Sequence, residues 1–260
     1  MRIGTWNVEY AVGAAKNARR REVLKQHGCD VWVLTETSDV LDLSGRYIPV
    51  HSAPRPNRPS RSRWVTIWSR YPILEIPRVV DPRRTVCALL AAPSGPLLIF
   101  GTVMPWATDY GDEPVSSQPR NWSEHHRVMA QQGEEWVALR EAYPAADLCA
   151  AGDLNTDIGG QPFYGTAVGR GLLREAMSRT DLFCATETAR IPAGALAHPP
   201  IDHVLLPTKW ETRTTVAAAW EGKATDGVRL SDHSGLVVEI EERSLARAAS
   251  SHDEGRQERW

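Results

Sequence analysis

The sequence predicts one α/β domain in which many strands alternate with a few helices. Apolar runs of strand length recur along the 260 residues and are separated by stretches with helical spacing. The apolar fraction is 42% and includes ten tryptophans, enough for one large core. No repeat and no linker divides the chain. We therefore expect residues 1–241 to form a single catalytic domain and residues 242–260, which mix charged and small side chains, to form a flexible tail or short helix.

The first half of the chain is predicted to be rich in strands. Residues 3–8 form a short apolar run, residues 14–27 follow as a Lys- and Arg-rich helix, and residues 30–36 form an apolar strand that finishes on a glutamate. Residues 51–63 are rich in Pro, Arg, Ser and Asn and are expected to form an exposed loop. Three further strands, punctuated by Pro and Gly, are expected at residues 64–69, 85–92 and 97–103.

The second half of the chain is predicted to contain two helices among further strands. Residues 123–141 have helical spacing, with Ser123 as the expected N-cap. A strand at residues 147–151 leads into residues 152–155, which are expected to form a turn. The expected buried positions of the first helix are Val128, Met129, Trp136, Val137 and Leu139. The remaining elements are a helix near residues 163–177 and strands at residues 201–206, 214–220 and 235–240.

Composition excludes several classes of protein. The formal net charge of −2 is incompatible with a uniformly basic nucleic-acid coat protein, although a local basic patch can still attract a polyanion. No stretch approaches the roughly 18 consecutive apolar residues of a membrane span, and the N-terminus lacks a signal-peptide pattern. The four cysteines form no CxxC pair, which favours a reducing cytoplasm over a secreted disulfide framework.

Polar side chains with metal-binding or catalytic capacity stand at the ends of the predicted strands. Strand ends converge in space more readily than their sequence separations suggest. Carboxylate and amide oxygens are the ligands that Mg²⁺ prefers, and Mn²⁺ can take its place at such sites. The sequence therefore predicts an open catalytic metal site. Its members are Asn7, Glu36, Asp153 with Asn155, Asp202 with His203, and Asp232 with His233.

Such a set of residues suits phosphoester hydrolysis. That reaction needs charge neutralisation on the phosphoryl oxygens, an in-line water made nucleophilic, and help for the departing oxygen. Each part has a candidate. Asn7 and Glu36 are predicted to hold the metal, Asp153 to orient or deprotonate water, Asn155 to donate to the phosphate, and His233, oriented by Asp202, to bind or protonate an oxygen.

Six segments together resemble the endonuclease/exonuclease/phosphatase superfamily, and they follow its order over nearly the whole chain. They are Thr5-Trp6-Asn7-Val8, Leu34-Thr35-Glu36, Trp68-Ser69-Arg70-Tyr71-Pro72-Ile73, Gly152-Asp153-Leu154-Asn155, Ile201-Asp202-His203-Val204 and Ser231-Asp232-His233-Ser234. The resemblance implies a DNase I-like, four-layered α/β sandwich: two mixed sheets face to face, helices outside, and the active site among the loops at one end. It also implies that Asp232 binds metal or water beside His233.

One segment departs from the family pattern. Where the family usually places a histidine, or a Tyr-x-x-Asn group, after the central strand, residues 102–106 are Thr-Val-Met-Pro-Trp. A usual phosphate-contacting side chain is therefore missing. The candidate replacements are Asp109, Asn121 and His125, and the alternatives are an altered substrate or reduced catalysis.

Each candidate also has a purely structural alternative. Asn7 can serve as a turn amide, Glu36 as a solvated strand end, and Asp153 with Asn155 as an Asx turn, but their joint order favours a site. His203 is predicted to be a packing residue, and His125 with His126 are predicted to lie on the surface.

Substrate contacts are predicted for Arg63, Trp106 and Asp109, and the basic loop also carries Arg55, Arg58 and Arg61 beside Trp64. The leading hypothesis is a Mg²⁺-dependent nuclease that hydrolyses DNA or RNA without integral membrane contact. The alternatives are a phosphoesterase acting on a small metabolite or a phospholipid, and a catalytically silent binding module.

Overall fold

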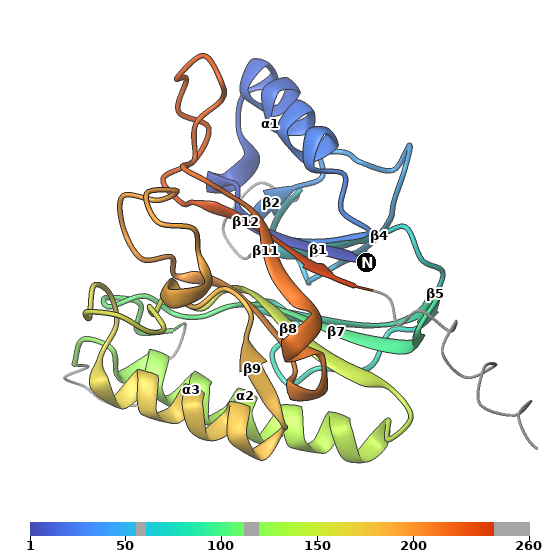
Figure 1. Ribbon diagram of the computed structural model, residues 1–260, viewed down its shortest axis with the longest axis vertical. Helices are drawn as coiled ribbons and strands as arrows, with labels where there is room; N and C mark the ends of the chain where they lie inside the picture. Colours follow the sequence, from blue (N-terminus) through green and yellow to red (C-terminus); the bar gives the residue numbers. More distant parts are fainter. Residues whose placement is uncertain (56–60, 112–119, 242–260) are drawn as a thin grey trace, which may run out of the picture.

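Two six-stranded sheets pack face to face in the computed structural model, which describes residues 1–55, 61–111 and 120–241. Figure 1 shows the two sheets stacked through the middle of the molecule. Helix α1 (Ala14–His27) covers the outer face of one sheet, and α2 (Ser123–Ala142) and α3 (Ala167–Arg179) cover the outer face of the other (Figure 1). The expected four-layered α/β sandwich is thereby confirmed.

The first sheet contains the N-terminal strand at its centre. Strands β1 and β2 are parallel, and every other neighbouring pair in this sheet is antiparallel. Its spatial order is β11 (Thr214–Trp220), β12 (Gly235–Ile240), β1 (Arg2–Asn7), β2 (Val31–Ser38), β4 (Ser62–Ser69) and β3 (Ile48–His51).

The second sheet has the same mixed character. Strands β7 and β8 are parallel, and the other neighbours are antiparallel. Its spatial order is β5 (Ile73–Glu75), β6 (Thr85–Ala92), β7 (Gly95–Val103), β8 (Asp147–Asp153), β10 (Asp202–Pro207) and β9 (Leu182–Cys184). Three 3-10 turns complete the fold: η1 (Glu9–Ala11), η2 (Thr188–Arg190) and η3 (Thr208–Arg213).

The apolar side chains form three layers that hold the sheets and helices together. Val33, Ile99 and Val204 are fully buried in the layer between the two sheets. On α2, Trp136 is fully buried and meets Phe100 edge-on at a ring-centroid distance of 6.0 Å. Because central strands are covered on both faces, they appear in the sequence as continuous apolar runs rather than as alternating patterns.

Several predicted helix and strand boundaries differ from the structure, and the strand expected to finish on Glu36 continues as β2 to Ser38. Strand β8 continues through Asp153, where a turn was expected, because Asp153 pairs with Asp202 of β10. Helix α3 begins at Ala167, after Thr166, whose hydroxyl accepts a hydrogen bond from the Gly169 N–H as an N-cap. The expected N-cap role of Ser123 is wrong, since Ser123 is already helical and Trp122 occupies the cap position in a left-handed conformation.

The expectation of an exposed loop at residues 51–63 is also wrong in part. His51 ends β3, β4 begins at Ser62, and Ser52 and Arg55 are buried. Arg58 and the predicted tail at residues 242–260 lie outside the described residues.

All four cysteines are buried free thiols. Within the described parts of the chain, none of the helices combines the length and the apolar character that a membrane crossing requires.

Candidate active site

The predicted site residues come from both sheets and meet at one end of the sandwich. Parallel β1 and β2 end at the same edge of the first sheet, and β7 and β8 end at the same edge of the second. The antiparallel strand β10 begins where β8 ends, so that Asp202 pairs directly with Asp153. In Figure 1 this end is the left side of the molecule, where the connecting loops gather, opposite the marked N-terminus.

His233 lies between two buried carboxylates. Its Nδ1 is 2.6 Å from Asp202 Oδ2, and its Nε2 is 3.9 Å from Asp153 Oδ2. Burial alone would lower the pKa of His233, but the charges of Asp202 and Asp153 outweigh burial and raise that pKa to about 10. The imidazole is therefore a cation at neutral pH in this arrangement, with Nε2 directed toward the Asp153 side of the site.

Two amides hold the carboxylate of Asp153. Asn7 Nδ2 donates to Asp153 Oδ2 at 3.1 Å, and the Asn155 backbone N–H donates to Asp153 Oδ1 at 2.9 Å. Burial raises the pKa of Asp153 to about 7; His233 opposes this shift and Asp202 adds to it. A carboxyl with a pKa near neutrality can exchange protons at neutral pH, which suits a general base.

The side chain of Asn7 is itself fixed in place. Asn7 Oδ1 accepts from the Glu9 N–H at 3.0 Å, and the backbone carbonyl of Asn7 accepts from the Ser231 hydroxyl at 2.6 Å. The same hydroxyl oxygen accepts from the His233 N–H at 3.0 Å. Ser231 thus connects the end of β1 to the loop that carries His233.

Glu36 reaches the site because β2 is irregular at this residue. Its neighbours Thr35 and Thr37 pair with Val65 and Arg63, whereas Glu36 has no partner in the ladder and adopts a φ of 48°. Burial raises the pKa of Glu36, while a hydrogen bond from Asn7 and the charge of His233 lower it. Non-glycine residues seldom adopt the left-handed conformation, and those that do are often found at functional sites.

The donor set fits a hard divalent cation. Asp153 and Asp202 each place a carboxylate oxygen within 4.8 Å of the other and of a His233 ring nitrogen, and since the His233 ring is protonated, the carboxylates are the donors for a cation. Asp202 Oδ1 is buried without a hydrogen-bond partner among the described residues, and an unpaired buried carboxylate oxygen is costly unless a cation lies near it. Asp232, a predicted ligand, lies at the rim: its side chain is 54% exposed and is 3.8 Å from Arg229.

The three candidate replacements for the missing family residue have other partners. Asp109 forms an ion pair with Arg84, and Asn121 accepts from the Tyr110 hydroxyl at 2.8 Å. His125 is fully buried, with Nδ1 2.8 Å from the Pro105 carbonyl oxygen, so its expected surface position is wrong.

Tyr164 is a site residue that sequence reasoning missed. The Ala107 N–H donates to its hydroxyl oxygen, and burial together with the charge of Asp153 raises the pKa of this hydroxyl. The ring meets Trp122 edge-on at 5.2 Å. Tyr164 therefore lies within electrostatic range of Asp153 and contacts the loop after β7 at Ala107, where the family's phosphate contact is missing.

A buried ion pair holds the backbone of Tyr164. Asp157 Oδ1 accepts from the Tyr164 N–H at 2.8 Å and from Arg170 Nη1 at 3.0 Å, and Arg170 also donates to the Tyr164 carbonyl at 3.1 Å. The only sequence signal was the position of Tyr164 in the loop that follows Asp153-Leu154-Asn155.

His203 has the packing role that was expected of it. It is fully buried, with Nδ1 3.1 Å from Thr186 Oγ1 and Nε2 3.0 Å from the Thr156 carbonyl. Burial lowers the pKa of His203 to about 4, so the ring is neutral.

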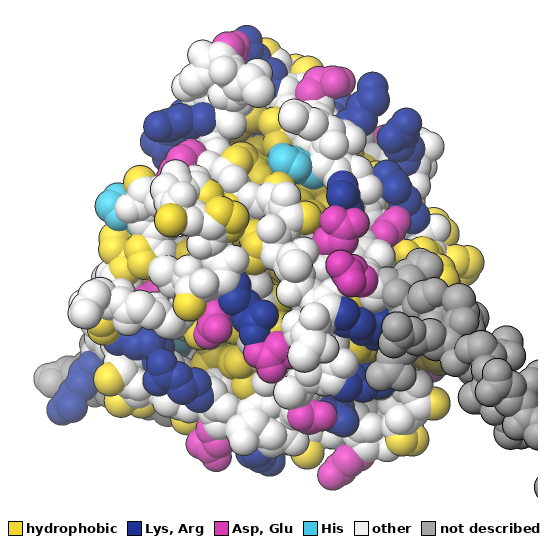
Figure 2. Space-filling model, in the orientation of Figure 1, with side chains coloured by type: hydrophobic (Ala, Val, Ile, Leu, Met, Phe, Trp, Pro, Cys, Tyr) yellow, Lys and Arg dark blue, Asp and Glu magenta, His cyan; other side chains and the backbone are white. Residues whose placement is uncertain are grey.

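Two of the predicted substrate contacts, Arg63 and Trp106, have partners within the protein. Arg63 donates to both carboxylate oxygens of Asp39, at 3.2 and 3.3 Å. Trp106 is partly buried, and its ring lies 6.1 Å from that of Trp64. On the face in Figure 2, Lys and Arg side chains are interspersed with Asp and Glu and do not form one continuous basic field.

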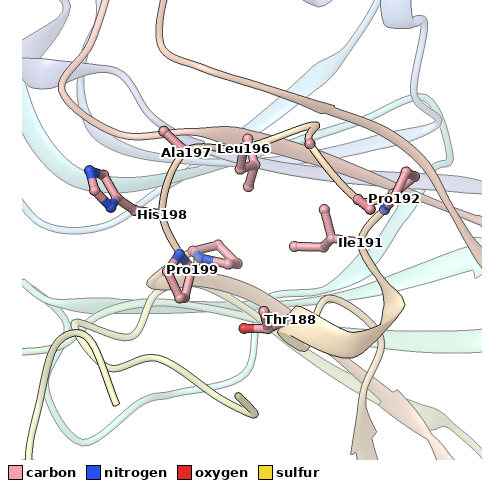
Figure 3. A pocket seen from close by; sticks show the side chains of 10 residues that line it. Thr188, Ile191, Pro192, Leu196, Ala197, His198 and Pro199 are labelled. Carbon is pink, nitrogen blue, oxygen red and sulfur yellow. The ribbon is translucent and has the colours of Figure 1, made fainter. Parts of the chain in front are cut away.

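A small pocket of about 170 Å³ is lined by residues between Thr188 and Pro200 and by none of the residues Asp153, Asp202 and His233. It forms within the segment that precedes Asp202. Figure 3 shows Ile191, Leu196 and Pro199 turned into it, with His198 at one side. The His198 ring stacks on exposed Phe163, with centroids 4.7 Å apart.

Comparisons with known proteins identify the same family and fold. The model of the Endonuclease/Exonuclease/phosphatase family matches residues 4–233. No curated protein matches the chain.

Similar solved structures include enzymes with different substrates. A 3'-5' exonuclease, NExo, from Neisseria meningitidis has 17% identity and a TM-score of 0.67 over 93% of this chain and 100% of that chain. An AP endonuclease from Archaeoglobus fulgidus has 15% identity and a TM-score of 0.62 over 93% and 100%. Sphingomyelinase C from Streptomyces griseocarneus has 17% identity and a TM-score of 0.57 over 93% and 99%. At these identities the likeness shows the fold alone.

Proposed function

Because the chain belongs to the Endonuclease/Exonuclease/phosphatase family, we propose that it is a Mg²⁺-dependent phosphodiesterase whose substrate is a nucleic acid. The observation that carries this proposal is the buried cluster of Asp153, Asp202 and His233, in which a general base and an imidazolium face each other across 3.9 Å. We further infer that the protein acts in a reducing compartment such as the cytoplasm, because its four cysteines are buried thiols.

Glu36 and Asn7, with Asp232 at the rim, would hold the cation. Bound Mg²⁺, or Mn²⁺ in its place, would supply charge neutralisation on the phosphoryl oxygens. Asn7 also positions Asp153 through its amide nitrogen, so the same side chain serves the cation and the base.

Asp153 and His233 would perform the proton transfers. Asp153 is oriented by the Asn7 amide and the Asn155 N–H, and it would accept a proton from the attacking water at a carboxylate oxygen. As the P–O bond to the leaving group breaks, His233 would donate its Nε2 proton to the departing oxygen, while Asp202 on Nδ1 keeps the ring protonated and fixed in orientation. No covalent intermediate with the enzyme is needed.

Two further side chains would contact the phosphate. Asn155 Nδ2 uses one N–H on the Met104 carbonyl, at 2.8 Å, and its second N–H would donate to a phosphoryl oxygen. The Tyr164 hydroxyl would donate to another oxygen, replacing the contact missing after β7.

The choice of nucleic acid over a lipid or small metabolite has support from two directions. NExo and the A. fulgidus enzyme are described as an exonuclease and an AP endonuclease. In addition, the charge of Arg55 acts on Glu36, and the backbone carbonyl of Arg84 accepts from the Val103 N–H at the end of β7. A lipid phosphodiesterase is the second candidate, because sphingomyelinase C shares the fold. A silent binding module is disfavoured, because candidates for the acid, the base and the cation ligands are all retained in the chain.

The test is hydrolysis of single-stranded DNA, duplex DNA, RNA and bis-p-nitrophenyl phosphate with Mg²⁺, Mn²⁺ or EDTA. Wild type is expected to cleave a nucleic acid only with metal, and Glu36→Ala and His233→Ala are expected to lose this activity. His27→Ala, which removes a histidine on α1 that stacks on Trp220, is the control and should keep it. Cleavage in EDTA, or no cleavage of any substrate by folded protein with bound metal, would contradict the proposal.

A further inference from the structure

An arginine–tryptophan cluster adjoins the candidate active site. The guanidinium carbon of Arg55 lies 3.5 Å from the centroid of the Trp64 ring, and that of Arg84 lies 5.1 Å from it. Trp64 and Arg55 are each only 7% exposed. Two guanidinium groups therefore share one aromatic ring in a region with little solvent, where cation–π attraction and any ionic contact are stronger than in water.

Both sides of this cluster are connected to the catalytic groups. Trp64 lies on β4 between Val65 and Arg63, the partners of the residues that flank Glu36 on β2. The guanidinium carbon of Arg55 lies 4.9 Å from the centroid of the Tyr10 ring in η1, which packs against β2, and the charge of Arg55 lowers the pKa of Glu36. The Trp106 ring lies next to the Trp64 ring, and Trp106 belongs to the loop that starts at Met104. The Met104 N–H donates to the Asp153 carbonyl at 2.8 Å. The cluster thus joins the two sheets beside the reacting centre.

Of the two terminal nitrogens of Arg84, one has a hydrogen-bond partner and the other has none among the described residues. Its Nη2 donates to Asp109, which fixes the plane of the guanidinium group. Its Nη1 is buried and has no hydrogen-bond partner among the described residues. A buried charged donor without a partner is unfavourable, and a guanidinium fork suits the oxygens of a phosphate.

We propose that Arg55 and Arg84, stacked on Trp64, form an anion subsite that binds a second phosphate of the substrate, next to the one that is hydrolysed. This inference rests on the proposed function and narrows it. A substrate with phosphates along a chain, as in an oligonucleotide, occupies both the reacting centre and the subsite. An isolated phosphodiester occupies the reacting centre only. Arg63, held by Asp39, is not part of the subsite.

The test compares two substrates, a short single-stranded oligonucleotide and bis-p-nitrophenyl phosphate. For Arg84→Gln and Arg55→Gln we expect the ratio of kcat/KM for the oligonucleotide to that for the isolated diester to fall roughly 10- to 100-fold, as for loss of a hydrogen bond to a charged group. Arg84→Lys, which keeps the charge but not the fork, should fall between wild type and Arg84→Gln. Arg179→Gln removes an equally charged group, paired with Glu134 on the outer helices, and should keep the wild-type ratio.

Binding of the fluorescein-labelled oligonucleotide in EDTA gives a second measurement that needs no catalysis. The slope of log affinity against log salt should decrease by about 0.7 for each arginine removed. An unchanged ratio and an unchanged slope in folded Arg84→Gln and Arg55→Gln would overturn the subsite, as would an equal loss on both substrates. Failure of the proposed function is a different result: wild type then cleaves neither substrate, and the EDTA titration alone decides whether the subsite exists.

Discussion

Replacing Asp202 with asparagine isolates the charge that acts on His233. Asp202 Oδ2 lies 2.6 Å from His233 Nδ1, and the two side chains are only 2% and 16% exposed. Asp202→Asn keeps the volume and removes the charge. A hydrogen bond to a charged group contributes about 1.5–3 kcal/mol. We therefore expect kcat/KM for bis-p-nitrophenyl phosphate to fall by roughly 10- to 100-fold at neutral pH.

The same substitution has a consequence for protonation that can be measured directly. Asp202 and Asp153 together raise the pKa of His233 to about 10 against the opposing effect of burial. Without Asp202, that pKa should fall toward the ordinary value of about 6.5. Because the folded-state pKa is raised, the stabilisation from this pair is fully present below about pH 6.5 and is lost as the pH rises through about 10.

The assay is an NMR titration of the His233 ring in EDTA, combined with steady-state kinetics in Mg²⁺. Asp226→Asn is a suitable control, because Asp226 is an exposed aspartate paired with Arg19, and it should leave both the pKa and the rate unchanged. A His233 pKa still near 10 in Asp202→Asn, or a kcat/KM within about threefold of wild type, would refute the assigned role of Asp202.

Three other substitutions test separate parts of the structure. Tyr164→Phe should lower kcat about 10-fold in steady-state assays, because one hydrogen bond to the phosphate is lost, and an unchanged kcat would remove Tyr164 from the site. For His203, whose pKa is lowered to about 4, the stabilisation is present above about pH 6.5 and is lost as the pH falls toward 4. Denaturant unfolding between about pH 7 and pH 5 should therefore show a smaller loss of stability in His203→Gln than in wild type. Gly152→Ala should lower the free energy of unfolding by about 3 kcal/mol, because φ is +135° and a Cβ would lie 2.0 Å from the Thr102 carbonyl oxygen. Gly171→Ala, with nothing within 4 Å, should melt near the wild-type temperature, and equal melting of the two variants would contradict this explanation.

Most long elements could be predicted from the sequence because their signals are local. The expected bounds of α1, β6, β11 and β12 agree with the structure. The largely buried strands β6 and β12 are marked by apolar runs, and α1 ends at Gly28 in a left-handed conformation. The short strands β3, β5 and β9 were not predicted. Each has only three or four residues, and its pairing with a distant strand, rather than its own sequence pattern, decides its conformation.

The sequence by itself determined the family and the candidate site residues, because Asn7, Glu36, Asp153, Asp202 and His233 stand near strand ends or in short adjoining loops that a local pattern can locate. The sequence also predicted that these strand ends lie close together, and in the structure Asn7, Asp153, Asp202 and His233 meet at one end of the sandwich.

Only the tertiary structure decided which charges and rings meet. Arg63 pairs with Asp39, Arg84 pairs with Asp109, and the Tyr164 ring meets the Trp122 ring. The partners of these contacts are between 24 and 42 residues apart in the chain, as the differences 63 − 39, 109 − 84 and 164 − 122 give. No helical or strand period relates such positions, so their contacts follow from where the loops meet at the end of the sandwich.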